Sequence, residues 1–277
     1  MIIMLLDYYQ PIRTDNSNPF ANYTMRERLP EVVQNIIDNN PAYSSSVKAQ
    51  LSSFKQNIID DAPIHPPDPY WWDYMEWHYS WSRNKGTSWL NAEWIFAETF
   101  LYRSTMQIIR YWEFGLDPFK DIKFEALTHK NITNVLTTGL SLRGPEHEVF
   151  AGLIGLSLWG NRMDLSYKTS MAHGTDLLDE EDLLINHTEE SFATITEGKG
   201  AVHLVTDNTG SELVADLMLA DFFIRKLHTD VVFHVKFYPT YVSDATSNDV
   251  LLSIEQMKKE TYSLISDFAG RLTTHLT

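Results

Sequence analysis

Apolar residues recur at helical spacing throughout the first half of the chain. Between Glu27 and Asn40 the apolar side chains share one helical face, and the sequence NNP then stops the run. A similar pattern begins near Ser46 and ends before the proline-rich segment 62–69. The longest candidate is 88–114, which is apolar around much of its circumference, as a central helix would be. Two further helices are predicted, at 119–140 and 146–159.

The pattern changes near residue 200, where two short apolar runs flank a helix-like stretch. The runs 200–207 (GAVHLVTD) and 229–239 (TDVVFHVKFYP) are typical of buried strands. Strand, helix and strand in this order form a βαβ unit, which implies a parallel sheet covered on both faces. His203 and His234 lie within the two runs, so we predict that both are core histidines with satisfied hydrogen bonds.

These patterns together predict an α/β fold with two domains. An all-helical domain, 1–145, is followed by an α/β domain, 146–277, built on a doubly wound parallel sheet. An amphipathic helix follows Asp244, and the sequence then stops at Thr277, where a parallel sheet needs another strand after the crossover. The sheet is therefore predicted to be incomplete at its C-terminal side.

Composition narrows the classes of partner. The formal net charge of -15, without clustered Lys and Arg, argues against a nucleic-acid-binding surface and favours cations or small molecules. No stretch reaches the roughly 18 apolar residues of a membrane span, and the opening MIIMLL lacks the flanks of a signal peptide. The absence of cysteine fits a reducing compartment. We predict a cytoplasmic protein that binds neither membranes nor nucleic acids.

Two segments each have two interpretations. The aromatic segment 68–81 (DPYWWDYMEWHYSW) either packs against the helical core, which is favoured because large aromatic side chains mostly serve burial, or forms a sugar-stacking surface. The run 176–190 holds seven acids and no base, and it is most simply a solvated helix or loop. Neither segment changes the predicted fold.

Polar side chains gather where the two predicted strands end. Asp207 and Asn208 follow the first strand, and Asp244 follows the second at the same edge of the sheet, where ligands bind in open parallel sheets. Two carboxylates and an amide oxygen suit Mg²⁺ or Mn²⁺. Gly210 permits a tight turn, and Glu212 lies in the first helical turn, near a metal or a substrate hydroxyl. An N-capping turn without any metal explains the same residues, and both interpretations stay open.

Longer stretches of this sequence resemble a known family. The stretches VTDNTGSELVADLMLADFFI and VVFHVKFYPTYVSD look like the metal-binding core of the damage-control phosphatases. The resemblance is to the subfamily of sugar-phosphate phosphatases that are also described as acidic-residue methyltransferases. Further matches, in the expected order, are RERLPEVVQNII, EWIFAETFLYR, DPFKDIK and SLWGNRMDLS.

This resemblance implies a helical domain followed by a Rossmann-like domain, and it implies a role for particular residues. The positions that match Asp207, Asn208 and Asp244 hold Mn²⁺ or Ni²⁺ in the family, and the position that matches Glu212 contacts substrate. Asn161 matches a motif near the active site. The family's RTLK-type motif, whose basic residues contact phosphate, does not occur in this sequence, so we expect a C-terminally shortened member.

The leading functional hypothesis is a metal-dependent phosphatase that hydrolyses small sugar phosphates, such as fructose 1-phosphate or fructose 6-phosphate, through a metal-activated water. Asp207, Asn208 and Asp244 hold the ion in this hypothesis, and Glu212 orients the substrate. One alternative is S-adenosylmethionine-dependent methylation of protein carboxyl groups. The other is an inactive, shortened paralogue that binds metal.

Overall fold

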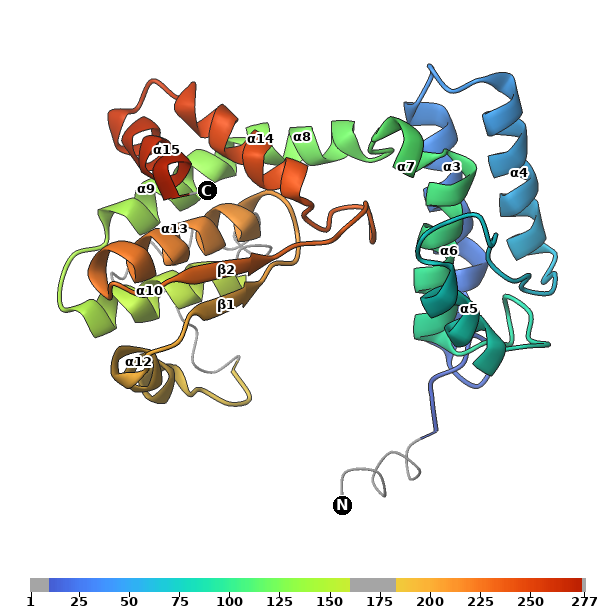
Figure 1. Ribbon diagram of the computed structural model, residues 1–277, viewed down its shortest axis with the longest axis horizontal. Coiled ribbons are helices and arrows are strands. Elements are labelled where there is room, and N and C mark those ends of the chain that lie inside the picture. Colours follow the sequence, from blue (N-terminus) through green and yellow to red (C-terminus); the bar gives the residue numbers. More distant parts are fainter. Residues whose placement is uncertain (1–9, 160–182, 276–277) are drawn as a thin grey trace. The chain divides into compact units, whose positions relative to one another are not determined.

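The computed structural model describes residues 10–159 and 183–275, and the chain divides into two compact units, Met1–Phe119 and Lys120–Thr277 (Figure 1). The described part of the first unit is built from helices. Its β-structure is limited to isolated bridges between single residues. Its elements in chain order are α2 (Pro19–Tyr23), the π-helical turn η1 (Thr24–Arg28), α3 (Leu29–Asn39), α4 (Ser45–Ile59), α5 (Tyr74–Arg83), α6 (Trp94–Ile108) and α7 (Tyr111–Phe114).

The first two predicted helices are confirmed by α3 and α4, which pack against each other. Leu29, Val33 and Ile36 are at most 1% exposed on the face of α3 that the apolar pattern marks. Each such side chain stabilises the fold by about 1.5–3 kcal/mol. Helix α4 begins where the Ser44 hydroxyl accepts a hydrogen bond from the Val47 N–H at 3.3 Å.

The predicted single helix 88–114 is wrong, because the backbone breaks it into α6 and α7. Arg110 adopts the left-handed conformation, with φ 57°, which cannot continue an α-helix. The core of the segment, α6, does lie in the interior: Arg103 is 1% exposed and makes a bidentate pair with Asp73 at 2.6 and 2.7 Å. Trp77 of α5 packs on Phe100 of α6 with ring centroids 5.6 Å apart.

The aromatic segment 68–81 is only partly packed in this arrangement. Trp77 contacts the helical core, whereas Tyr70 is 79% exposed and Trp72 is 61% exposed. Both halves mix packed and exposed rings, since Trp71 packs on Trp112 with ring centroids 5.2 Å apart and Tyr79 of α5 is 64% exposed, so the packing interpretation holds for part of the segment only.

The second unit holds the parallel sheet. Its elements in chain order are α8 (Lys120–Thr128), α9 (Lys130–Ser141), α10 (Glu146–Trp159), α12 (Thr188–Glu197), β1 (Val202–Val205), α13 (Ser211–Lys226), β2 (Val231–His234), α14 (Ser247–Lys258) and α15 (Ser263–His275). The predicted helix 119–140 is wrong in one respect, because His129 is extended, with ψ 141°, and separates α8 from α9. The predicted helix 146–159 is confirmed as α10.

The predicted βαβ unit is confirmed. Strands β1 and β2 pair in parallel, Val202 with Val231 through Val205 with His234, and α13 forms the crossover (Figure 1). Within residues 10–159 and 183–275 the sheet has these two strands. The fold of this unit is therefore α/β and rich in helix, and the doubly wound sheet stays a prediction.

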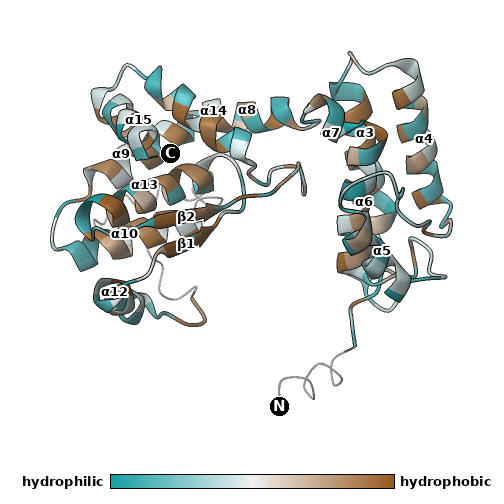
Figure 2. Cartoon of the chain, viewed as in Figure 1, coloured by the Kyte–Doolittle hydropathy of each residue, from teal (hydrophilic) through white to brown (hydrophobic). Residues whose placement is uncertain are grey.

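The two strands bury one face and leave the other open. Val202, Leu204 and Phe233 pack against the core formed by α9, α10 and α13 to α15, and both strands are largely hydrophobic (Figure 2). The alternate side chains point outward, and Val205 is 80% exposed. The prediction of fully buried strands is wrong, since the helices packed on the described strands cover only one face.

The histidine prediction is wrong for the same reason. His203 and His234 occupy outward positions, are exposed, and face each other with Nδ1 and Nε2 2.7 Å apart. The alternation of side chains along a strand, rather than the apolar run as a whole, decides which residues are buried.

Helices α8 and α9 belong to the second unit. Helix α9 packs on α13 and α15, and α8 packs on α14. In the sequence the first unit ends at Phe119, whereas the predicted domain boundary, 145/146, lies between α9 and α10. Of the helices that are described, none is both long enough and apolar enough to cross a membrane.

Candidate functional site at the carboxyl edge of the sheet

The backbone brings the ends of both strands together. Thr206 extends the pairing of β1 with N–H and hydroxyl hydrogen bonds to the His234 carbonyl, each 3.1 Å. The Ala245 N–H then donates to the Asp207 carbonyl at 2.7 Å, and the Thr209 N–H to the Ser243 carbonyl at 2.7 Å. Asn208 and Asp244 lie opposite each other in this antiparallel bridge. The structure therefore places the predicted residues 207, 208 and 244 at one edge.

Asn208 connects the two strand ends through its side chain. Its Oδ1 accepts a hydrogen bond from the Ser243 hydroxyl at 2.5 Å. Its Nδ2 donates to Glu212 Oε2 at 3.1 Å and to Asp207 Oδ2 at 3.4 Å. Because both ends of the amide are used, its orientation is fixed, and the amide oxygen points to the β2 side of the site.

Glu212 lies in the first turn of α13 and faces back toward the loop. Its Oε2 also accepts a hydrogen bond from the Asn208 N–H at 3.2 Å. Burial raises the pKa of Glu212, the hydrogen bonds from Asn208 oppose this rise, and the charges of Asp207 and Asp244 add to it. The sequence-predicted residue therefore joins the site, as a half-buried carboxyl group among other carboxyl groups.

Asp244 is the buried acid of the site, at 3% exposure. Its Oδ2 lies 2.9 Å from Lys236 Nζ, and Lys236 comes from the segment directly after β2. Burial raises the pKa of Asp244, Lys236 opposes the rise, and Asp207 adds to it. Lys236 therefore brings a basic side chain to this edge, where it pairs with an acid of the site.

Two left-handed residues precede Asp244. Tyr241 has φ 49° and Val242 has φ 71°, and a β-branched residue rarely adopts this conformation. The N–H of Ser243 bonds to the Tyr241 carbonyl at 2.8 Å, so the bend is tight. Strain of this kind is found where the surrounding structure holds a functional group in place. Here the bend delivers Ser243 and Asp244 to Asn208.

Gly210 makes the corresponding turn on the β1 side. Its φ of 102° and ψ of -134° are accessible to glycine and costly for other residues. The turn directs the chain from the Asp207 loop into α13, whose positive N-terminal end then faces the site. The sequence predicted this role from the residue type.

Asp216 also belongs to this cluster, and sequence reasoning missed it. It lies one helical turn after Glu212 on α13, and it accepts a hydrogen bond from the Ser157 hydroxyl of α10 at 2.6 Å. Burial raises the pKa of Asp216 from 3.8 to about 6, Ser157 opposes the rise, and Glu212 and Asp207 add to it. The spacing of four residues from Glu212 on a helix was the signal that could have found it.

A buried ion pair holds in place the segment that follows Asp244. Lys123 of α8 and Asp249 of α14 are 2.8 Å apart and are 1% and 5% exposed. The same Asp249 oxygen accepts hydrogen bonds from the N–H and the hydroxyl of Thr246, at 2.8 and 2.7 Å. Thr246 is the N-cap of α14, so this network fixes the backbone two residues beyond Asp244.

The donor set fits a hard divalent cation. Asp207 and Asp244 offer carboxylate oxygens and Asn208 an amide oxygen, and the mutual repulsion of the acids favours a positive charge among them. In the part of the chain that is described, no three His, Cys, Asp or Glu side chains form a ligand cluster. An ion at this edge would therefore need water or substrate oxygens to complete its coordination. Asn161 lies outside the described residues.

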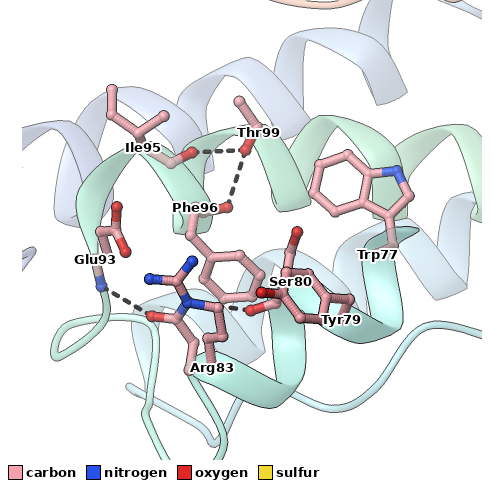
Figure 3. Close-up of a pocket in the computed structure, with 9 residues that line it drawn as sticks. Trp77, Tyr79, Ser80, Arg83, Glu93, Ile95, Phe96 and Thr99 are labelled. Carbon is pink, nitrogen blue, oxygen red and sulfur yellow. Dashed lines mark hydrogen bonds between the residues drawn. The ribbon is translucent and has the colours of Figure 1, made fainter. Parts of the chain in front are cut away.

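A separate cavity of about 310 Å³ opens between α5 and α6 in the first unit. Trp77 and Phe96 form its aromatic wall, with Arg83 and Glu93 at the other side (Figure 3). Polar groups that line the cavity bond to each other; for example, the Glu93 N–H donates a hydrogen bond to Asn84 Oδ1 at 3.4 Å. None of the sequence-predicted site residues lines it.

The family match and the similar proteins all indicate the same family. Residues 24–277 match the family described as the damage-control phosphatase ARMT1-like domain. The chain is 33% identical to damage-control phosphatase ARMT1 of Rattus norvegicus over 196 residues, 61% of this chain and 45% of that protein. For the proteins of the same name from Danio rerio and Homo sapiens, the identity is 30% over 221 and 230 residues, covering 48% and 51% of their lengths and 67% and 71% of this chain. The chain thus spans about half the length of the curated relatives it matches.

Proposed function

Because the chain belongs to the family of ARMT1-like damage-control phosphatases, we propose that it is a metal-dependent phosphatase acting on small sugar phosphates of the fructose 1-phosphate or fructose 6-phosphate type. The observation that carries the proposal is the convergence of both strand ends on Asn208. Its side chain is hydrogen-bonded to Glu212, Asp207 and Ser243, and its backbone pairs with the Asp244 segment.

The ion in this proposal is Mn²⁺ or Ni²⁺, with Mg²⁺ as a further candidate, and its ligands are Asp207, Asn208 and Asp244. A divalent ion bound there would act as a Lewis acid toward the phosphoryl oxygens and would lower the pKa of a hydrolytic water. Asp207 is exposed and can meet an incoming ion, while Asp244 is buried and fixed by its segment. Asp207 is thus the ligand that an ion in solution can reach first, and Asp244 is the ligand whose position is fixed.

The remaining side chains bind and orient the substrate. Lys236 lies beside Asp244, and its ammonium group is suited to hold a phosphate oxygen. The N-terminal end of α13 favours the same negative charge. Glu212, with its raised pKa, can share a proton with a sugar hydroxyl, and Asn208 holds its carboxyl group toward the site. We also propose that β1 and β2 belong to a Rossmann-like doubly wound sheet and that the protein acts in the cytoplasm.

The test is a phosphate-release screen over sugar phosphates with Mn²⁺, Ni²⁺ or Mg²⁺, using the metal-stripped chain. Release that requires the ion and is lost in Asp207→Ala is the expected result. The matched control is Asp230→Ala, an exposed acid beside the opposite end of the sheet, which should keep full activity.

Two outcomes contradict the proposal. A folded chain that binds Mn²⁺ and releases no phosphate from any sugar phosphate identifies an inactive metal-binding paralogue. Binding of labelled S-adenosylmethionine, with methyl transfer to protein carboxyl groups and no phosphate release, identifies a methyltransferase.

A further inference from the structure

The open face of the sheet carries a pair of histidines that the proposed phosphatase site does not use. His203 of β1 and His234 of β2 are both exposed, and His203 Nδ1 lies 2.7 Å from His234 Nε2. The ring centroids are 5.0 Å apart and the planes are inclined by 27°, so the two rings meet nearly edge to edge. Two imidazole nitrogens therefore lie directly opposite each other at the surface.

The sheet holds this pair in place. Val205 is paired with His234 and His203 with Val232, so the two histidines are diagonal neighbours on the same face. Leu204 follows His203 in β1, and Phe233 precedes His234 in β2. Both of these side chains pack on the opposite face of the sheet, against the helical core. The Cα positions of the two histidines are thus fixed, and only their rings can adjust.

We propose that His203 and His234 form a binding site for a divalent transition-metal ion, Cu²⁺ or Ni²⁺, with both imidazoles as cis ligands. Ligand nitrogens about 2.0–2.1 Å from a metal are about 2.9 Å apart at a right angle and about 3.4 Å apart in a tetrahedron. The observed 2.7 Å is the length of a hydrogen bond, so the nitrogens have to separate by about 0.2 Å for a right-angle site, and imidazole ligands bind Cu²⁺ most tightly of the common divalent ions. Because the two nitrogens point at each other in this hydrogen bond, both rings must rotate outward to direct their lone pairs at a shared ion.

Binding replaces the hydrogen bond between the rings without net release of a proton. One of the two nitrogens now carries the shared hydrogen. When the ion binds, that ring moves its proton to its other nitrogen, so both neutral imidazoles present a lone pair. Water completes the coordination, because no third His, Cys, Asp or Glu joins the pair among the residues that are described.

This site differs chemically from the oxygen site at the carboxyl edge. Imidazole nitrogens favour Cu²⁺ over Mn²⁺, whereas carboxylate and amide oxygens suit Mn²⁺ and Mg²⁺, so Cu²⁺ and Mn²⁺ distinguish the two sites while Ni²⁺ is a candidate for both. Lys236 is two residues beyond His234, and its charge is paired with Asp244. Metal binding by the two histidines is therefore independent of any phosphatase activity at the carboxyl edge.

The test is Cu²⁺ titration of the metal-stripped full chain, followed by calorimetry and electron paramagnetic resonance. The expected result is one tight equivalent with the nitrogen couplings of two imidazoles. His203→Ala and His234→Ala should each weaken it by on the order of 100-fold, since a tethered second ligand acts at high effective concentration. His187→Ala, an exposed histidine of the same unit, should leave it unchanged.

A second variant separates the two metal sites. Asp207→Ala should keep the Cu²⁺ equivalent and its two-imidazole signature, and the histidine variants should keep Mn²⁺ binding. Both histidines are exposed, so circular dichroism should show unchanged folding in their variants. Cu²⁺ affinity that is unchanged in both histidine variants, or a tight equivalent that disappears in Asp207→Ala alone, overturns the proposal.

Discussion

At the scale of single residues, the candidate site depends on side chains that bond to each other across the ends of β1 and β2. Asn208 is hydrogen-bonded to Glu212 and Ser243, and Asp216 extends the cluster along α13. Acids in such a cluster repel each other, and burial adds to the effect, so their pKa values rise. Their titration is therefore coupled to the stability of the fold.

For Asp216 the direction in which pH changes the stability of the fold can be predicted and measured. Its pKa in the folded chain, about 6, is above its ordinary 3.8, so the folded state binds the proton more tightly. The stabilising contribution is complete below the lower value and is lost as the pH rises through the higher one. Between about pH 4 and pH 7, wild type should lose about 2 kcal/mol of unfolding free energy relative to Asp216→Asn. Urea denaturation of both proteins at several pH values measures the difference, and parallel curves would contradict it.

Gly210 tests the backbone of the site. Gly210→Ala should destabilise the fold by about 1–3 kcal/mol, because alanine does not tolerate a φ of 102°. Gly270→Ala is the matched control, since Gly270 is exposed inside α15 and an added methyl group meets nothing within 4 Å. The control should be neutral or stabilising by about 0.5–1 kcal/mol. Equal thermal denaturation midpoints for the two variants would show that the turn is not strained.

At the scale of elements, the second unit positions the site through contacts between helices that are distant in sequence. The ion pair of Lys123 and Asp249 joins α8 to the first turn of α14 and holds the N-cap that follows Asp244. Removing one partner of a buried pair leaves an uncompensated charge, which is far costlier than losing a surface pair.

Lys123→Met should therefore destabilise the chain by about 3–5 kcal/mol. Lys120→Met, an exposed lysine of the same helix, should change stability by less than about 0.5 kcal/mol. Chemical denaturation measures both. The double variant Lys123→Met and Asp249→Asn should lose less stability than the sum of the losses in the two single variants. If the losses of unfolding free energy simply add, the two residues do not act as a pair.

At the scale of the whole molecule, charge is the dominant property. The formal net charge is -15, so the long-range field attracts cations and repels anionic phosphate esters. In the proposed phosphatase, a basic local group such as Lys236 would have to hold the substrate phosphate against this field. The two compact units each have their own helices, and every hydrogen bond described above for Asp207, Asn208 and Glu212 is made within the second unit.

This charge predicts a salt dependence. Mn²⁺ affinity should fall several-fold between about 20 and 200 mM KCl, as the screening length shortens from roughly 20 to 7 Å. Isothermal titration at the two salt concentrations measures it. For a sugar phosphate the Michaelis constant should change less or in the opposite sense, because the same screening weakens repulsion. An affinity for Mn²⁺ that does not depend on salt would show that the local ligands alone determine binding.

The sequence by itself determined the βαβ unit, the helices α3, α4 and α10 and the family, because these follow from periodicity and motifs that are local in the chain. It also indicated which loops end at the same sheet edge, since strand direction dictates that. Only the tertiary structure decided the rest. It brought Asp216 and Lys236 into the cluster, buried Lys123 beside Asp249, and turned His203 toward His234 on an open face. Those arrangements depend on which faces pack against each other, and such contacts join residues far apart in sequence.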